Sequence, residues 1–479
     1  MKLIYEKSVS GCPGVSLPSS DVPSAIQLPQ ALLRAEPAKL PELSELDVVR
    51  HFTNLSRLNV GVDTVFYPLG SCTMKYNSKA IEDAARLFLS PHPMTAMLPG
   101  GEAFNQGSLA LLHHMSQALA EITGMDEVTC QPLAGAHGEV TGIMLIAAWH
   151  KSRGKQKKYI IVPDSSHGTN PASAAMAGYE IITVPTAPYG DMDLDAFKVA
   201  LSDQVAAVMM TCPNTLGLFN PHIKEICDLA HAADALVYYD GANLNAILGK
   251  VRPGDLGFDV VHVNLHKTFG TPHGGGGPGS GPVGVKKPLV PFLPLPRVIR
   301  KEDGAYSLMT DAPESIGRMA AFYGNFGVIA KAYAYTLMLG REGLIEASEM
   351  AVLNANYMMN RLKDLYDLPY DQICMHECTF SASRQTEHGI HAIDIAKFLI
   401  DKGFHPPTVY FPLIVKEAIM IEPTETESKA TLDVFIDAMR EAARLAKDDP
   451  EALKKAPVTT PVSRLDETKA AREQKVCLD

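Results

Sequence analysis

The sequence predicts an α/β protein built on a mostly parallel β-sheet and followed by a smaller α/β domain. Between residues 159 and 285, short and nearly all-apolar runs alternate with stretches of helical periodicity. Strands that are apolar along their whole length are typical of a sheet covered by helices on both faces. In addition, 46% of the 479 residues are hydrophobic and 20% are charged, which is enough apolar material for a large core.

The elements follow from local patterns. Residues 1–100 are predicted to be an N-terminal arm, because ten prolines interrupt them. A helix is expected at 104–123, where apolar residues recur on one face and Gly124 supplies a stop. Strands are expected at residues 159–162, 181–184, 206–210, 236–239, 260–263 and 283–285. The helices that alternate with them are expected at 138–151, 193–202 and 222–233.

A change of pattern marks the end of the large domain. Four prolines in KKPLVPFLPLPR (286–297) predict a break, and a long helical region is expected at 314–363. A mixture of strands and helices continues to about residue 445. We therefore predict four parts: an arm at 1–100, a large α/β domain at 101–310, an interdomain helix with a smaller C-terminal domain at 311–450, and a charged tail at 451–479.

Bulk composition excludes several classes of protein. The net charge of −11 argues against a general affinity for nucleic acids or anionic membranes. The eight cysteines are scattered, so reduced thiols in a cytoplasmic compartment are expected. No secretory signal is visible in MKLIYEKSVSGCPG, and no uncharged apolar run reaches the roughly 20 residues of a membrane helix.

One short segment has the spacing of metal ligands. Cys374, His376 and Cys378 lie close together in the sequence, but no second pair of ligands accompanies them. Structural zinc sites need four ligands, so no metal is expected.

Polar residues follow several of the predicted strands. Thr211 follows the strand at 206–210, Asp240 follows the strand at 236–239, and His266 and Lys267 follow the strand at 260–263. His167 lies in a Ser/Thr/Asn-rich loop that opens a helix. Because parallel sheets bind ligands at the carboxyl ends of their strands, these side chains are the first candidates for a site.

The pairing of Asp240 with Lys267 favours pyridoxal phosphate (PLP). A lysine forms a Schiff base with the PLP aldehyde, and an aspartate beside the pyridine nitrogen keeps that nitrogen protonated. The PLP phosphate requires exposed N–H groups at a helix N-terminus, which the segment containing Gly135 and Ala136 can supply. Taken singly, each residue has a structural explanation: a solvated lysine, an aspartate in a turn, a histidine at a helix start. The joint pattern is what favours PLP.

The glycine-rich segment after Lys267 is not a nucleotide-binding loop. In NLHKTFGTPHGGGGPGSGP (264–282) the lysine precedes the glycines, whereas a Walker loop places it after them and before a helix. A Rossmann fingerprint also fails, because this loop leads into another strand. We expect the glycines to let backbone approach a crowded site.

Several motifs resemble glycine dehydrogenase (decarboxylating), the P-protein family of the glycine cleavage system. They extend over most of residues 1–450 and read YPLGSCTMKYN (67–77), SSHGTNPASA (165–174), CPNTLGLF (212–219), DGANLNA (240–246), RPGDLGFD (252–259), the lysine segment 264–282 and IEPTETES (421–428). The resemblance implies the aspartate-aminotransferase type of fold, known as fold type I of the PLP enzymes.

The resemblance also implies roles for individual residues. Lys267 matches the Schiff-base lysine, Asp240 the partner of the pyridine nitrogen, and His167 the histidine stacked on the ring, with Ala242 packed beneath it. The expected catalytic residues are thus Lys267, His167 and Asp240. The expected cofactor contacts also include Ala242, Gly135, Ala136, His266, Thr268 and Thr211. Two positions depart from the family pattern: His137 replaces an expected glutamine, and Gly270 a cysteine found in some relatives.

The implied reaction is PLP-dependent decarboxylation of glycine, with transfer of the aminomethyl group to the lipoyl group of the H-protein. The implied partners are glycine dehydrogenase subunit 1, in an α2β2 assembly, and the lipoylated H-protein. The alternatives are an aminotransferase, a cysteine desulfurase using Cys374 or Cys378, and a non-catalytic scaffold. A basic cluster, Lys286, Lys287, Arg297, Arg300 and Lys301, is either a docking surface for an acidic carrier or a solvated face.

Overall fold

The computed structural model describes residues 2–12, 14–22, 28–36, 38–88, 91–275 and 277–474. They form two compact units, Met1–Thr64 and Val65–Asp479. The first unit contains the 3-10 helices η1 (Tyr5–Lys7) and η2 (Gln30–Leu32) and the helix α1 (Glu45–Ser56). Its apolar side chains are mostly exposed, so this unit has little core of its own. The four-part division predicted above remains a prediction.

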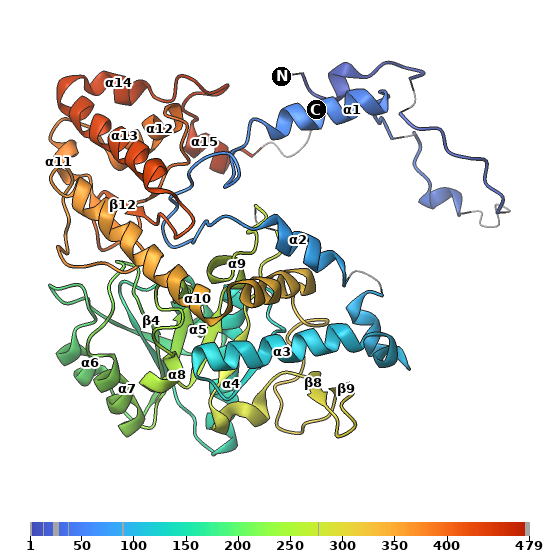
Figure 1. Cartoon of the computed structure of the whole chain (residues 1–479), viewed down its shortest axis with the longest axis vertical. Helices are drawn as coiled ribbons and strands as arrows, with labels where there is room; N and C mark the ends of the chain where they lie inside the picture. The colour runs from blue at the N-terminus through green and yellow to red at the C-terminus, as the bar shows by residue number, and fades with distance from the viewer. Residues whose placement is uncertain are drawn as a thin grey trace. The chain divides into compact units, whose positions relative to one another are not determined.

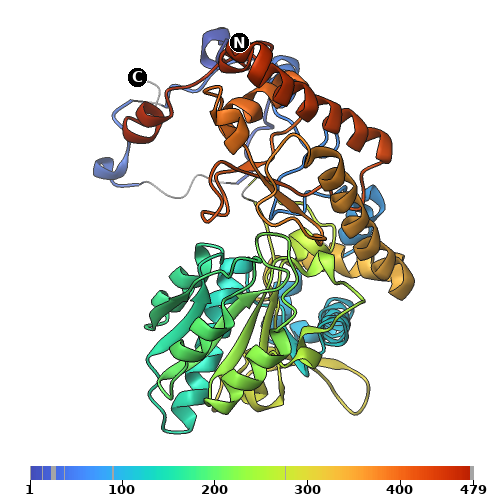
Figure 2. The ribbon, with the colours of Figure 1, turned by 90° about the vertical axis from the view of Figure 1, so that its left-hand side faces the viewer.

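The second unit is built around a seven-stranded sheet, seen in Figures 1 and 2 with helices on both faces. The strand order is β1-β7-β6-β5-β4-β2-β3. Strands β2 to β6 run parallel to one another, whereas β7 pairs antiparallel with both of its neighbours, β6 and β1. The strands are β1 (Glu127–Thr129), β2 (Tyr159–Pro163), β3 (Glu180–Val184), β4 (Val205–Thr211), β5 (Leu236–Gly241), β6 (Val260–Val263) and β7 (Val283–Val285).

The expected strands and the mostly parallel α/β fold are confirmed. Every residue of β4 and β5 is buried, in line with their uninterrupted apolar sequences. The sequence analysis missed β1, because three residues are too short to show a period.

Helices pack on both faces of the sheet and form two separate cores. Side chains of α4 and α5 pack on one face with Tyr238 and Val260, whereas those of α3 and α7 pack on the other with Tyr239 and Val261. The helices are α3 (Gln106–Thr123), α4 (Gly135–Ser152), α5 (Thr169–Met176), α6 (Leu194–Ala200), α7 (Ile223–Ala232), α8 (Pro253–Leu256) and α9 (Leu265–Thr268). The predicted helix at 138–151 begins three residues earlier than expected.

Further short elements connect these layers. They are α2 (Lys79–Arg86), η3 (Pro93–Met97), η4 (Gly101–Phe104), η5 (Leu244–Ala246), η6 (Lys287–Phe292) and the hairpin of β8 (Arg297–Arg300) and β9 (Tyr306–Met309). The long helix α10 (Phe326–Leu362) begins twelve residues later than predicted, after Gly317 and Gly324, which both adopt positive φ. Non-helical backbone at Gly340 divides it in two.

The C-terminal elements form a second, smaller sheet with its own core, as expected (Figure 1, orange to red). Its three antiparallel strands, in the order β10-β12-β11, are β10 (Cys378–Ser381), β11 (Thr408–Val409) and β12 (Ala418–Ile421). The accompanying helices are α11 (Ser383–Thr386), α12 (Ala392–Asp401), α13 (Lys429–Asp448), α14 (Pro450–Lys455) and α15 (Glu467–Arg472). Among the described residues, no helix has both the length and the apolar character needed to span a bilayer.

Candidate active site

A cavity of about 180 Å³ lies at the carboxyl ends of β4, β5 and β6. Eight of the nine residues predicted to contact a cofactor line it, namely Lys267, Asp240, His167, Ala242, Gly135, Ala136, His266 and Thr211. Thr268 is not in the lining: it is buried, and its backbone oxygen accepts a hydrogen bond from Lys75. A larger cavity of about 700 Å³ beside α10 is mostly apolar and contains neither Lys267 nor Asp240.

Lys267 reaches this cavity from α9, the single turn that follows β6. Its Nζ donates a hydrogen bond to the backbone oxygen of Ser71, at 2.7 Å. Ser71 belongs to the YPLGSCTMKYN segment, almost two hundred residues upstream. In the sequence this segment is recognisable only as a family motif, whereas in the structure it lies against the lysine.

Asp240 ends β5 and is only 2% exposed. Its Oδ2 accepts from Asn170 Nδ2 at 2.8 Å, and its Oδ1 accepts from the backbone N–H of Ala242 at 3.0 Å. Burial alone would raise the pKa of this carboxyl. The His262 ring and the two hydrogen bonds outweigh burial, so the pKa lies below its usual value and Asp240 is held as a carboxylate.

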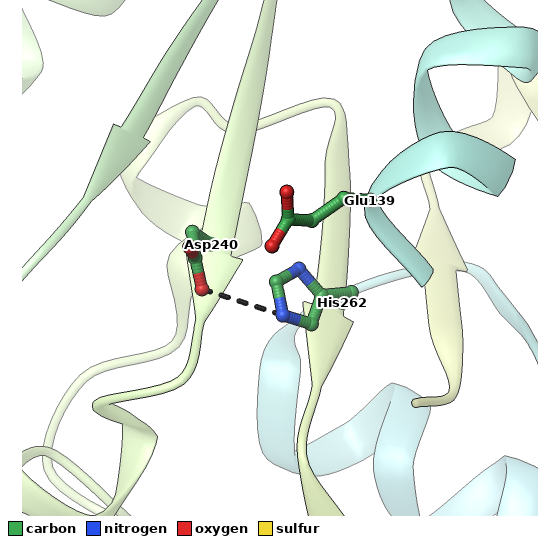
Figure 3. A group of neighbouring side chains, drawn as sticks. All are labelled: Glu139, Asp240 and His262. Carbon is green, nitrogen blue, oxygen red and sulfur yellow. Dashed lines mark ion pairs between the residues drawn. The ribbon is translucent and has the colours of Figure 1, made fainter. Parts of the chain in front are cut away.

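His262 is the direct neighbour of Asp240 on the adjacent strand β6, where the two residues are paired in register. Figure 3 shows the two side chains facing each other together with Glu139 of α4. His262 Nε2 lies 3.3 Å from Asp240 Oδ1, and Nδ1 lies 2.7 Å from the hydroxyl of Tyr238. Both ring nitrogens are therefore engaged, which argues against a metal in this group although its spacing would permit one.

Glu139 links the helices that frame the cavity. Its carboxylate accepts from Thr169 Oγ1 at 2.7 Å and from Ser173 Oγ at 2.9 Å, so α4 holds α5 in place. The sequence analysis missed this residue, and also missed Asn170, His262 and Tyr238. The only available signal was a histidine inside the otherwise apolar run VVHV, which is unusual for a strand buried on both faces.

His167 and Thr211 both lie at the carboxyl ends of the parallel strands, but His167 is exposed and Thr211 is buried. His167 is exposed just before α5, and its Nδ1 lies 2.9 Å from Thr169 Oγ1. Thr211 ends β4 beside Asp240, and its buried Oγ1 has no hydrogen-bond partner among the residues that the structure describes. Ala242 contributes a small apolar surface two residues after the carboxylate.

The N-terminus of α4 lies at the edge of the cavity, where Gly135 and Ala136 are part of the lining. The first intrahelical bond is donated by Gly138 to Ala134, so the N–H groups of Gly135, Ala136 and His137 have no acceptor within the helix. A Cβ at Gly135 would lie 2.5 Å from Asn264 Oδ1, so glycine is needed there. His137 turns back to accept from the N–H of Leu133 at 3.1 Å.

The residues present fit PLP. A lysine, a buried carboxylate and a helix N-terminus converge on one cavity, and within the described part of the chain Asn264 Oδ1 and Thr211 Oγ1 at its wall lack hydrogen-bond partners. A ligand that is linked to an amine, has a cationic ring and carries a phosphate would match the lysine, the carboxylate and the helix N-terminus respectively.

His266 does not add a positive charge beside Lys267. Its Nδ1 accepts from the N–H of Ser280 at 3.3 Å, and its ring centroid lies 5.1 Å from that of His273. Burial, together with the neighbouring His273 and Lys267, lowers the pKa of His266 to about 3. The ring is therefore neutral at physiological pH.

The glycines after Lys267 allow close backbone approach, as expected. A Cβ at Gly281 would lie 2.1 Å from the oxygen of Ala134, and one at Gly270 would lie 2.9 Å from the Tyr335 ring. Gly270 also adopts a φ of +59°, which favours glycine. Gly276, in the same loop, lies outside the described residues.

Two other sequence hypotheses lose support. Lys286 and Lys287 follow β7, which runs antiparallel to β6. They therefore lie near the amino end of β6, whereas Lys267 follows its carboxyl end. Cys374 and Cys378 are 2% and 1% exposed in the C-terminal core, and His376 faces glutamates instead. The seven described cysteines are all free; Cys477 lies outside the described residues.

Comparison with known proteins decides the family. A model described as glycine cleavage system P-protein matches residues 15–388, and one described as glycine dehydrogenase, C-terminal domain, matches 347–457. A protein of Listeria innocua named probable glycine dehydrogenase (decarboxylating) subunit 2 is 57% identical over 479 residues, covering 99% of this chain and 97% of that protein. The chain belongs to the glycine cleavage system P-protein family.

Solved structures support the P-protein fold. A glycine decarboxylase (P-protein) in inhibitor-bound form superimposes with a TM-score of 0.71 at 21% identity, over 86% of this chain and 93% of that one. A cysteine desulfurase from Thermococcus onnurineus NA1 gives a TM-score of 0.61 at 16% identity, over 79% and 95%. The fold type I prediction is confirmed. The family match also decides against an aminotransferase or a desulfurase.

Proposed function

We propose that this chain is the lysine-bearing subunit of a glycine dehydrogenase (decarboxylating), with its active site in the cavity around Lys267 and Asp240. The enzyme decarboxylates glycine and passes the aminomethyl group to the lipoyl group of the H-protein. The family assignment supports the reaction, and the meeting of Lys267, Asp240 and the α4 N-terminus in one cavity supports the location.

PLP, the cofactor of this fold type, supplies an electron sink for the carbanion left when glycine loses CO2. Lys267 Nζ would hold the cofactor through its aldehyde and, when free, is placed to hold or return a proton. Asp240 would keep the ring nitrogen protonated, because its own carboxyl pKa is lowered. Gly135 and Ala136 would present backbone N–H groups to the phosphate.

His262 and Asn170 act on Asp240 and not on the substrate. Each contacts one oxygen of the carboxylate, so together they fix its orientation and its charge. His167 and Ala242 are proposed to contact the two faces of the ring. His266, Thr211 and Thr268 remain weaker candidates for phosphate contacts, and Thr268 would need to rotate its buried Oγ1 toward the cavity.

The relative's name, subunit 2, implies a partner subunit. We propose glycine dehydrogenase subunit 1 in an α2β2 assembly, the lipoylated H-protein as second substrate, and a cytoplasmic location that suits the free cysteines.

Borohydride reduction of the PLP-loaded chain, followed by peptide mass mapping, tests the site. The reduced cofactor should be found on Lys267. The nearby Lys75 is the internal control, because its Nζ is buried and already bonded to Asn245 and Glu425. A label on Lys75, or on no lysine at all, would contradict the assignment and favour a scaffold.

A further inference from the structure

The backbone that receives Lys267 is held by two glutamates that the proposed reaction does not use. Glu377 precedes β10 and Glu422 follows β12, and the antiparallel pairing of Cys378 with Ile421 brings them to the same end of the small sheet. Both are fully buried. The segment 70–73 passes over this end of the sheet, directly after Leu69 forms an isolated bridge with Ile421.

Three successive backbone N–H groups of this segment point at the carboxyl groups of the two glutamates. Ser71 N donates to Glu377 Oε2 at 2.7 Å. Cys72 N and Thr73 N donate to Glu422 Oε2 at 3.1 and 2.8 Å. Thr73 Oγ1 donates to Glu422 Oε1 at 2.5 Å. Both oxygens of Glu422 thus accept hydrogen bonds from the segment, and Oε1 also lies 3.8 Å from His376 Nε2.

Two residues of the segment have backbone in the left-handed region. Ser71 and Thr73 have φ values of +63° and +47°, which are unfavourable for residues with a side chain and especially for β-branched threonine. Such backbone persists only where its surroundings determine it. The consequence is that the carbonyl of Ser71 turns away from the glutamates and accepts the Lys267 Nζ.

The other end of the segment is fixed independently. Lys75 is buried and bonds through Nζ to Glu425 Oε1 at 2.5 Å and to Asn245 Oδ1 at 2.7 Å. The three residues between Gly70 and Met74 are therefore held from both sides, with their N–H groups on the glutamates and one carbonyl on the lysine.

We propose that residues 71–73 form a dock for the Lys267 amine while it is not bonded to the cofactor, and that Glu377 and Glu422 are the positioning residues that hold this dock. The proposal rests on the proposed function in one respect, that Lys267 is the cofactor lysine. The dock gives the released amine a fixed place near the cavity instead of leaving it free to rotate away.

The test compares the full-length chain with Glu422→Gln and Glu377→Leu, using Glu417→Gln as the matched control. Glu417 also accepts a backbone N–H, from Ala392 at 2.8 Å, and lies beside the same small sheet but does not contact the dock. Amide hydrogen exchange at residues 71–73 and the rate at which an acylating reagent labels Lys267 are measured by mass spectrometry, with Lys250 as the internal reference lysine.

In Glu422→Gln we expect exchange at Cys72 and Thr73, and labelling of Lys267 relative to Lys250, to rise about tenfold or more, because a charged acceptor is replaced by a neutral one. Glu377→Leu should do the same at Ser71, and Glu417→Gln should change neither quantity. Should either variant fail to fold, Thr73→Val removes only the hydroxyl bond and should give a smaller change in the same direction.

Two results would overturn the proposal. Unchanged exchange at all three amides would show that the glutamates do not position the segment. Faster exchange with Lys267 labelled at the wild-type rate would show that the segment does not hold the amine. Neither readout requires turnover, so they are independent of the borohydride result that tests the proposed function.

Discussion

Asp240 Oδ1 and His262 Nε2 face each other at 3.3 Å, from paired positions on neighbouring strands. Both side chains are almost completely buried, and the remaining nitrogen of His262 contacts the hydroxyl of Tyr238. The strand register thus fixes a carboxylate, an imidazole and a phenol in a row behind the cavity. The protonation state of Asp240 therefore depends on the neighbouring His262 ring, which lowers the pKa of the carboxyl against the effect of burial.

Replacing His262 by leucine should lower the rate of CO2 release about tenfold, a change that corresponds to roughly 1.4 kcal/mol. Without the imidazole the pKa of Asp240 rises, because burial is then opposed only by Asn170, Ala242 and Lys267. As the pH falls, the carboxylate is lost earlier, so the acid limb of the pH–rate profile should move to higher pH. Tyr238→Phe, which keeps the imidazole, should move it less. An unshifted acid limb in His262→Leu would contradict this role.

Glu377→Gln should raise the melting temperature relative to wild type by an amount that grows as the pH rises. Burial, followed by the neighbouring Glu422, raises the pKa of Glu377 well above its usual value. A raised carboxyl pKa contributes stability that is fully present below the unfolded-state pKa and is lost as the pH rises toward the folded-state pKa. Glutamine does not titrate, so its advantage in thermal unfolding should grow from acid to neutral pH. A difference in melting temperature that is constant with pH would rule out a protonated Glu377.

Gly135→Ala should weaken cofactor binding by roughly 1–3 kcal/mol, the range for an overpacked site. The new methyl group would meet Asn264 Oδ1 at 2.5 Å and disturb the N-terminus of α4 where the phosphate is proposed to bind. PLP affinity is measured from the absorbance of the bound cofactor. Gly107→Ala is the control, because a Cβ there meets nothing within 4 Å. Equal affinities in the two variants would place the phosphate elsewhere.

Charge reversal of Lys287 and Lys301 to glutamate should leave the KM for the lipoyl carrier unchanged at low ionic strength. Lys287 follows β7 at the edge of the sheet opposite to Lys267, and Lys301 follows the β8 strand of the adjoining hairpin. A carrier that delivers its lipoyl arm to the cavity would have no reason to contact them. A severalfold rise in KM in the double variant would restore the basic cluster as a docking surface.

The sequence predicted the main sheet because its strands are short, apolar and separated by helical periods, and the candidate site residues were sought at the ends of these strands. Lys267 and Asp240 could be found because both stand directly after apolar runs. His262 could not be assigned, because its partner depends on the register between β5 and β6, which local pattern does not determine.

The residues around Ser71 show a second reason why part of the structure could not be predicted from the sequence. Glu377 and Glu422 lie more than 300 positions from the segment that they hold. Their carboxylates look like ordinary surface charges in sequence, and only the pairing of β10 with β12 brings them together and buries them. The start of α10 was misplaced for a simpler reason, because glycines with positive φ delay a helix that apolar periodicity alone would extend.

The central claim is tested most directly by the release of CO2 from carboxyl-labelled glycine. The assay contains this chain, glycine dehydrogenase subunit 1, PLP and an oxidised lipoyl carrier. The variant Lys267→Ala is compared with Lys250→Ala, a substitution at an exposed position, after thermal unfolding has shown that both variants are as stable as the wild type. We expect carrier-dependent release from the wild type and from Lys250→Ala, and none from Lys267→Ala. Substantial release from folded Lys267→Ala would contradict the assignment of Lys267 as the cofactor lysine.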